Sequence, residues 1–183
     1  TYAKEGECTL RVASQRETEA EAQLAVNNMI SEIEKLIGNY IYSYDDEELS
    51  EVVVKQLKEK SLKLSSAESC TGGLFASCIT DVSGASSVFS YGFVTYSAAA
   101  KSEILNVDNE VIEKYSVVSA EVAVLMAKGA QNAANSDISV SVTGYAGPEA
   151  DPGRDNGNAY IGYSCSERFG GKCGYVEINT KRN

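Results

Sequence analysis

From residue 47 onward, segments with a helical period alternate with short strand-like segments, and this order limits the folds that the chain can adopt. Helices are expected over 45–61, 72–84, 98–107, 108–115 and 119–136, and strands over 62–67, 89–97, 137–148, 157–165 and 174–179. Strands and helices that alternate in this way form a sheet covered by helices on both faces. We therefore expect an α/β fold, a three-layer α/β/α domain with a largely parallel sheet.

The first 46 residues have a different order and form a smaller segment. A strand is expected over 6–14, a helix over 16–38 and a short strand over 40–44. The apolar side chains of this helix fall on one face and are Val26, Met29, Ile30, Ile33, Leu36 and Ile37. Two strands and one helix bury little surface, so we expect a fragment of a small α+β domain. The expected domains are residues 1–46 and 47–183.

Two loops of small residues directly follow predicted strands. One reads Glu-Ser-Cys-Thr-Gly-Gly at 68–73, and the other reads Thr-Gly-Tyr-Ala-Gly-Pro at 143–148. Parallel strands present their carboxyl ends at one edge of a sheet, and ligands bind beyond that edge. We expect both loops at this edge.

The 68–73 turn has two interpretations. Its backbone N–H groups at the start of a helix suit a phosphate or an oxyanion, and its glycines permit close approach, so a hydroxyl here is a candidate nucleophile. Equally, Ser69 or Thr71 serves only as a helix cap. Cys70 is a rival nucleophile, although a buried structural cysteine is the more common case.

The chain contains no histidine, which excludes Ser-His-Asp and Cys-His catalysis and metal sites built on imidazole. A serine nucleophile then needs another base, and a desolvated lysine is an attested solution. Lys101 closely follows the strand predicted over 89–97 and is the candidate base, with Tyr96 as a residue that bridges the pair or orients the nucleophile. A solvated lysine and a packed tyrosine are the alternative interpretation.

The composition restricts the classes of partner. The 26 acidic residues outnumber the 16 basic ones, and this charge repels nucleic-acid backbones, so no nucleic-acid partner is expected. No apolar run approaches membrane length and no signal-peptide pattern is present, so we expect a cytoplasmic protein without a membrane partner. Five cysteines without metal-ligand spacing suit a reducing compartment.

Four motifs in register resemble a known family. They are AESCTGG (67–73), GFVTYS (92–97) followed by Ala100 and Lys101, VS.EVA..MA.GA (118–130) and VTGYAGP (142–148). Together they resemble the C-terminal domain of the CinA (competence/damage-inducible protein A) family over roughly residues 47–178. Residues 7–46 resemble the end of the KH-like middle domain of longer members.

The resemblance implies an activity and a site. It implies hydrolysis of nicotinamide mononucleotide (NMN) to nicotinate mononucleotide and ammonia by a homodimer, without a metal or another cofactor. It implies Ser69 as the nucleophile, Lys101 as the base and Tyr96 as its helper. The substrate-binding residues that it implies are Glu68, Cys70, Thr71, Gly72 and Gly73 in the first loop, and Thr143, Gly144, Ala146 and Gly147 in the second.

Two departures from the family pattern affect the choice of substrate. The family commonly has Asn where this chain has Ala98, and the loop over 149–158 also differs from the usual sequence. A lost amide removes both a donor and an acceptor, so amide hydrolysis is better supported than NMN itself. The alternative function is a nucleotide-binding module that has lost its turnover.

Overall fold

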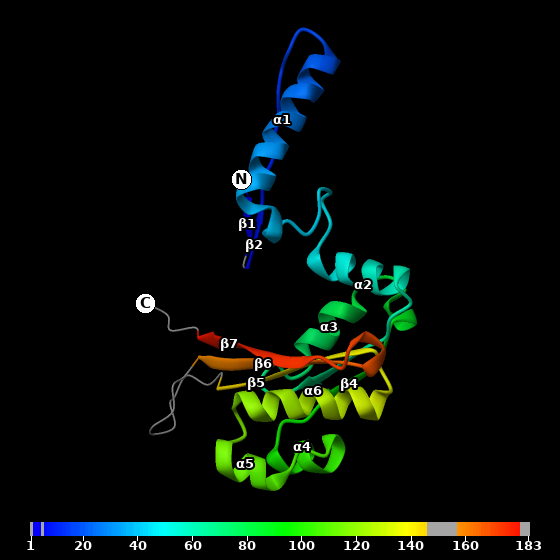
Figure 1. Ribbon diagram of the computed structural model, residues 1–183, viewed down its shortest axis with the longest axis vertical. Helices are drawn as coiled ribbons and strands as arrows, with labels where there is room; N and C mark the ends of the chain where they lie inside the picture. Colours follow the sequence, from blue (N-terminus) through cyan, green and yellow to red (C-terminus); the bar gives the residue numbers. More distant parts are fainter. Residues whose placement is uncertain (1, 5, 146–156, 180–183) are drawn as a thin grey trace. The chain divides into compact units, whose positions relative to one another are not determined.

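The computed structural model describes residues 2–4, 6–145 and 157–179. The chain forms two compact units, Thr1–Glu47 and Glu48–Asn183 (Figure 1). The second unit contains every described residue of the candidate site.

The N-terminal unit consists of a hairpin and one long helix. Strands β1 (Tyr2–Lys4) and β2 (Glu7–Thr9) pair antiparallel around Gly6, whose φ of 80° suits a glycine. Helix α1 (Glu19–Ile37) begins with a capping box between Thr18 and Glu21. All of α1 lies in the described part of the chain, and its predicted apolar face is only partly covered. Val26, Ile30 and Ile33 are half-buried, whereas Met29, Leu36 and Ile37 are exposed.

Two strand predictions in this unit need correction. The strand expected over 6–14 is formed only by β2, and the strand expected over 40–44 is wrong. Helix α1 instead continues into the 3-10 turn η1 (Gly38–Tyr40). The alternating Tyr-Ile-Tyr pattern favours a strand, but Tyr44 uses its hydroxyl to donate to the Glu34 carboxylate of α1. At residues 40–44, local contacts therefore outweigh the strand propensity of the sequence.

The second unit is built on a five-stranded sheet with the order β4-β3-β5-β6-β7. Its strands are β3 (Leu64–Glu68), β4 (Phe89–Val94), β5 (Ile138–Gly144), β6 (Asn158–Cys165) and β7 (Cys173–Asn179). Strands β4 and β5 flank β3 in parallel, whereas β6 and β7 are added antiparallel. The connection over 166–172 is too short for a parallel crossover, which explains the antiparallel pairing of β6 with β7.

Helices cover both faces of this sheet, so the predicted three-layer α/β/α arrangement is confirmed (Figure 1). Helices α2 (Leu49–Glu59) and α3 (Leu74–Thr80) lie on one side, with the 3-10 turn η2 (Ala85–Ser87). Helices α4 (Ala98–Leu105), α5 (Asn109–Tyr115) and α6 (Ala120–Ala134) lie on the other. Each side has its own apolar cluster, the first around Val54 and Ile79 and the second around Leu105 and Met126.

Small residues let α6 approach both the sheet and α4 closely. A Cβ atom on Gly129 would lie 2.0 Å from the Leu105 carbonyl oxygen, and one on Gly162 would lie 2.3 Å from the Ala123 carbonyl oxygen. Neither position accepts a side chain without movement of the backbone. Helix α4 is therefore fixed against α6, and this contact sets the position of Lys101.

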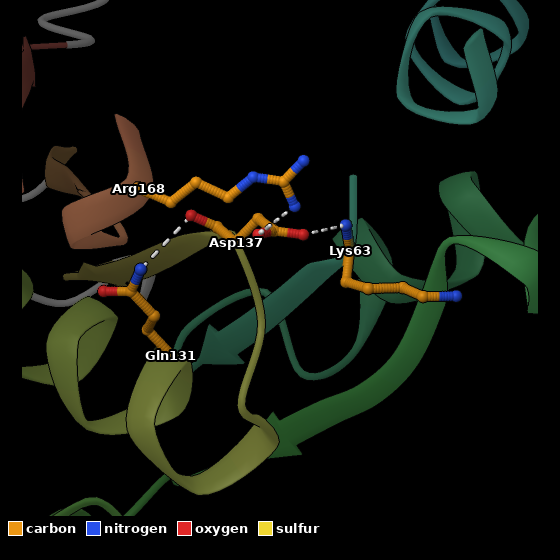
Figure 2. A network of polar contacts seen from close by, with 4 residues as sticks. All are labelled: Lys63, Gln131, Asp137 and Arg168. Carbon is orange, nitrogen blue, oxygen red and sulfur yellow. Dashed lines mark hydrogen bonds and ion pairs between the residues drawn. The ribbon is translucent and has the colours of Figure 1, made fainter. Parts of the chain in front are cut away.

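The amino ends of β3 and β5 are joined by a polar network around Asp137 (Figure 2). The Asp137 carboxylate accepts from the Lys63 N–H at 2.9 Å and lies 3.8 Å from Arg168 Nη1 of the 3-10 turn η3 (Glu167–Phe169). The Asp137 carbonyl accepts from the Gln131 side-chain amide at 3.2 Å. The network aligns the starts of β3 and β5, so that their carboxyl ends also coincide.

Candidate active site

The three parallel strands end together at the edge opposite the Asp137 network. The Ser69 N–H donates to the Val142 carbonyl of β5 at 2.9 Å, and the Thr95 N–H donates to the Glu68 carbonyl of β3 at 2.8 Å. The residues that follow β3 and β4 are thus held side by side. This agrees with the prediction that the 68–73 turn and the start of the 143–148 loop share one edge.

The side chains of Ser69 and Lys101 meet at this edge, although 32 positions separate them in the chain. Lys101 lies on α4 and is 1% exposed, and Ser69 directly follows β3 and is 7% exposed. Lys101 Nζ lies 3.0 Å from Ser69 Oγ, 2.8 Å from the Thr95 carbonyl oxygen and 3.1 Å from the Tyr96 carbonyl oxygen. The lysine is therefore buried and in contact with a hydroxyl.

Burial lowers the pKa of Lys101, and the nearby Cys70 offsets this only in part. As an ammonium ion, Lys101 uses its three N–H groups on the two carbonyls and on Ser69 Oγ. As a neutral amine it keeps two N–H groups for the carbonyls, and its lone pair faces the serine hydroxyl. The two carbonyls thus orient the neutral lysine as a base toward Ser69.

The turn after Ser69 leaves no donor free at the start of α3. The N–H groups of Gly73, Phe75 and Ala76 donate to the Glu68 carboxylate at 2.9 to 3.1 Å, and that of Leu74 donates to the Thr71 carbonyl. Gly72 and Gly73 have φ values of 59° and 107°, which a residue with a side chain rarely adopts. The expectation that Gly73 donates to a substrate anion therefore needs correction, because its N–H donates to Glu68.

Cys70 lies beside the pair, but its environment disfavours a thiolate. Burial raises the pKa of Cys70 and outweighs the N–H groups of Cys70 and Thr71, which lower it together with Lys101. The thiol form makes Cys70 a weaker nucleophile candidate than Ser69. The N–H groups of Cys70 and Thr71 lie close enough to the Cys70 thiol to lower its pKa.

The structure places the other predicted residues at the edge but not all in contact with the pair. The Tyr96 side chain is 76% exposed, and the contact that this residue makes with Lys101 uses its carbonyl. Thr143 is buried and its hydroxyl donates to the Val117 carbonyl, which leaves that proton unavailable to a ligand. Gly144 ends β5, and a Cβ there would lie 2.9 Å from that of Ala159. Ala146 and Gly147 lie outside the described residues.

Thr95 is not among the predicted site residues, although it directly precedes Tyr96 and contacts Lys101. Its carbonyl accepts from Lys101, and its hydroxyl is buried without a partner among the described residues. The Thr71 hydroxyl is also buried and unpartnered within the same ranges. Unsatisfied buried hydroxyls call for a ligand or a water molecule. The one signal for Thr95 was its position next to Tyr96 in the family motif.

Two further findings concern metals and membranes. Within 2–4, 6–145 and 157–179, no three His, Cys, Asp or Glu side chains gather as metal ligands do. The helices in these same ranges include none that combines the length and apolarity needed to cross a bilayer.

Fold and site together define an α/β domain with a serine–lysine pair at the carboxyl edge of its sheet. The sequence matches the CinA C-terminal domain over residues 46–183 and the KH domain of damage-inducible protein CinA over residues 1–43. The chain therefore belongs to the CinA family.

Known relatives support this assignment. A CinA-like protein of Dictyoglomus thermophilum is 44% identical over 162 residues, which cover 88% of this chain and 39% of the relative. The chain thus spans about two fifths of the length of such curated relatives.

Solved structures show the same fold. The CinA superfamily protein of Escherichia coli is 33% identical and superposes with a TM-score of 0.70, over 79% of this chain and 85% of that one. The competence/damage-inducible protein of Agrobacterium tumefaciens, also 33% identical, gives 0.68 over 76% of this chain and 83% of that one.

Proposed function

We propose that the second unit is a metal-independent amidohydrolase, which converts NMN and water to nicotinate mononucleotide and ammonia. The observation that carries this proposal is the contact of buried Lys101 with Ser69, in which two carbonyls orient the amine. A lysine with a lowered pKa beside a hydroxyl is an arrangement for nucleophilic catalysis. The choice of NMN rests on the family motifs, and the choice of an acyl-transfer mechanism rests on the pair.

The first half of the reaction forms an ester on Ser69. The Ser69 oxygen attacks the carboxamide carbon while its proton moves to Lys101 Nζ. The carbon–nitrogen bond then breaks, and the proton on Lys101 passes to the leaving nitrogen, which departs as ammonia. The second half hydrolyses this ester. Water attacks the acyl carbon, Lys101 accepts its proton, and that proton returns to the Ser69 oxygen as nicotinate mononucleotide leaves.

Both halves place negative charge on the carbonyl oxygen of the substrate. The N–H groups of Cys70 and Thr71 are the best-placed donors for this oxyanion, because those of Gly73, Leu74, Phe75 and Ala76 already have acceptors. The unpartnered hydroxyls of Thr71 and Thr95 are further donors at the same edge. Main-chain donors next to the nucleophile are the usual means of stabilising such charge.

The test measures ammonia released from NMN by the purified chain in the presence of a chelator. Wild-type protein releases ammonia, and Ser69→Ala releases none while it keeps its fold. Ser66→Ala is the matched control. Ser66 is buried like Ser69, lies on β3 just before it, and has a hydroxyl without a partner in the described ranges. Ammonia release by Ser69→Ala at the wild-type rate would reject the mechanism.

A nucleotide-binding module without turnover is the second candidate function. The observations that favour it are the exposed Tyr96 side chain and Ala98 at the first position of α4, where the family commonly has Asn. Saturable NMN binding by calorimetry without ammonia release would support this function and exclude the hydrolase.

A further inference from the structure

Glu68 is a buried carboxylate that the proposed reaction does not use. It ends β3, immediately before Ser69, and is 1% exposed. A buried carboxylate is costly unless hydrogen bonds compensate for its lost hydration. Here its oxygens accept from Gly73 N–H at 3.1 Å, Phe75 N–H at 3.0 Å and Ala76 N–H at 2.9 Å. These are charge-assisted bonds at the positive end of α3.

The carboxylate and the nucleophile lie on opposite faces of the sheet. Successive residues of a strand point to opposite sides. Glu68 points to the side of α3, as its hydrogen bonds show, and Ser69 points to the side of α4, where Lys101 lies. Glu68 therefore has no contact with the base, and the sheet separates it from the reacting atoms.

The bonds of Glu68 close a ring around the turn that carries Ser69. One end of the turn is the last residue of β3, and the other end is the start of α3, which the carboxylate binds three times. Inside the ring, Gly72 N–H donates to the Ser69 carbonyl at 3.2 Å. Without the carboxylate, this glycine-containing turn would be attached to the start of α3 by the chain itself and by the bond from Leu74 N–H to the Thr71 carbonyl.

We propose that Glu68 is the positioning residue of this turn, which holds Ser69 toward Lys101 by fixing residues 69–73 to the first turn of α3. This inference rests on the proposed function for its effect on turnover. It also changes the assignment of Glu68 from a substrate-binding to a positioning residue. Because the carboxylate occupies the start of α3, the phosphate of the substrate binds elsewhere.

The first experiment compares Glu68→Gln with wild type in NMN hydrolysis. The glutamine has the same shape but accepts with one oxygen, so at least one of the three N–H groups loses its acceptor. A displaced nucleophile lowers kcat by about 10²-fold, whereas KM stays near the wild-type value because Glu68 does not touch the substrate. Glu51→Gln is the matched control, since Glu51 accepts from Glu48 N–H at the start of α2. We expect this variant to have the wild-type kcat.

The second experiment does not depend on activity. Burial is the main cause of the raised pKa of Cys70, and the charge of Glu68 adds to it. Glu68→Gln removes this charge and loosens the turn, so iodoacetamide, followed by peptide mass spectrometry, modifies Cys70 faster than in wild type. Glu51→Gln shows the wild-type rate. If Glu68→Gln does not fold, Glu68→Asp keeps the charge but shortens the reach, and the same loss of kcat is expected.

The outcomes separate this inference from the proposed function. A wild-type kcat together with wild-type Cys70 reactivity in Glu68→Gln overturns the positioning role, even if Ser69→Ala is inactive. An inactive wild-type protein overturns the proposed function. In that case the role of Glu68 in the turn is still supported if Cys70 is modified faster in Glu68→Gln than in wild type and Glu51→Gln. A fall in kcat with unchanged KM, absent from Glu51→Gln, supports both.

Discussion

The two edges of the central sheet hold charged side chains in opposite ways. At the amino edge, the Asp137 side chain is 18% exposed and lies near Arg168, which has the opposite charge. At the carboxyl edge, Lys101 is buried against carbonyls and a hydroxyl, and no carboxylate of the described residues lies within ion-pair distance. The charge of Asp137 is therefore compensated at the amino edge, whereas the charge of Lys101 is disfavoured at the carboxyl edge.

This difference supports a structural role for the Asp137 network and the proposed catalytic role for Lys101. A partly exposed carboxylate with a backbone donor and a cation contributes modestly to stability. A buried lysine without a counter-ion weakens the folded state when it is charged, and proteins keep such groups where chemistry needs them. The contrast predicts that changes at Lys101 affect activity, whereas changes at Asp137 affect stability.

The largest expected effect is on turnover in Lys101→Met. Loss of the general base lowers kcat by about 10²- to 10⁴-fold, measured as ammonia release from NMN. Wild-type kcat/KM rises with pH through the lowered pKa of Lys101, and the variant lacks this rise. Lys63→Met is the control, because Lys63 lies at the other edge and donates to the Ser87 carbonyl. A variant with the wild-type pH dependence would rule out Lys101 as the base.

Lys101 also gives the wild-type protein a dependence of stability on pH. Its pKa is lower in the folded protein than in the unfolded chain, so the unfolded chain binds more protons between the two values. The free energy of unfolding therefore gains a contribution that rises with pH across this window and is absent below it. Urea unfolding at a series of pH values measures this contribution as the difference in unfolding free energy between wild type and Lys101→Met. If this difference in unfolding free energy did not change with pH, Lys101 would have its ordinary pKa in the folded protein.

A smaller effect is expected from Asp137→Ala at the amino edge. The change removes the acceptor of the Lys63 N–H and the neighbour of Arg168, which costs about 1 kcal/mol of unfolding free energy. Turnover per folded molecule stays at the wild-type level, because the network lies at the opposite end of the strands. Denaturant unfolding and the ammonia assay measure the two quantities. A large loss of kcat at unchanged stability would contradict the separation of the two edges.

The smallest effect is expected from Cys70→Ser. Cys70 is held as a thiol by its raised pKa and contributes its N–H group, which a serine at this position also provides. The variant should therefore retain most of the wild-type kcat in the ammonia assay. Complete loss of turnover would instead identify Cys70 as the nucleophile.

The sequence predicted the fold of the second unit well because each element carries a local signal. Helix α6 begins after Ser119, whose hydroxyl accepts from the Val122 N–H as expected of a helix cap. The strand predicted over 62–67 is β3, shifted by one or two residues at each end. The wrong strand at 40–44 has residue types typical of a strand, but Tyr40 ends η1 and Tyr44 donates to Glu34 of α1 instead.

The site was harder to predict because it depends on the directions of side chains. Ser69 and Lys101 were chosen from residue chemistry and family motifs, and only the folded chain brings them within 3.0 Å. The sequence predicts N–H groups at the start of α3 that are free for a ligand, but in the structure the Glu68 carboxylate accepts from three of them. Spacing alone does not show that a carboxylate reaches back across a turn. The roles of Ser69, Lys101 and Tyr96 stay predictions.

The most direct test of the central claim is to trap the covalent intermediate. Wild-type protein is mixed with NMN, quenched with acid during turnover and digested, and the peptide that contains Ser69 is analysed by mass spectrometry. We expect this peptide to carry the mass of the nicotinate mononucleotide acyl group in wild type and in Cys70→Ser, and to be unmodified in Ser69→Ala. An acyl group that persists in Ser69→Ala, or that disappears in Cys70→Ser, would contradict Ser69 as the nucleophile.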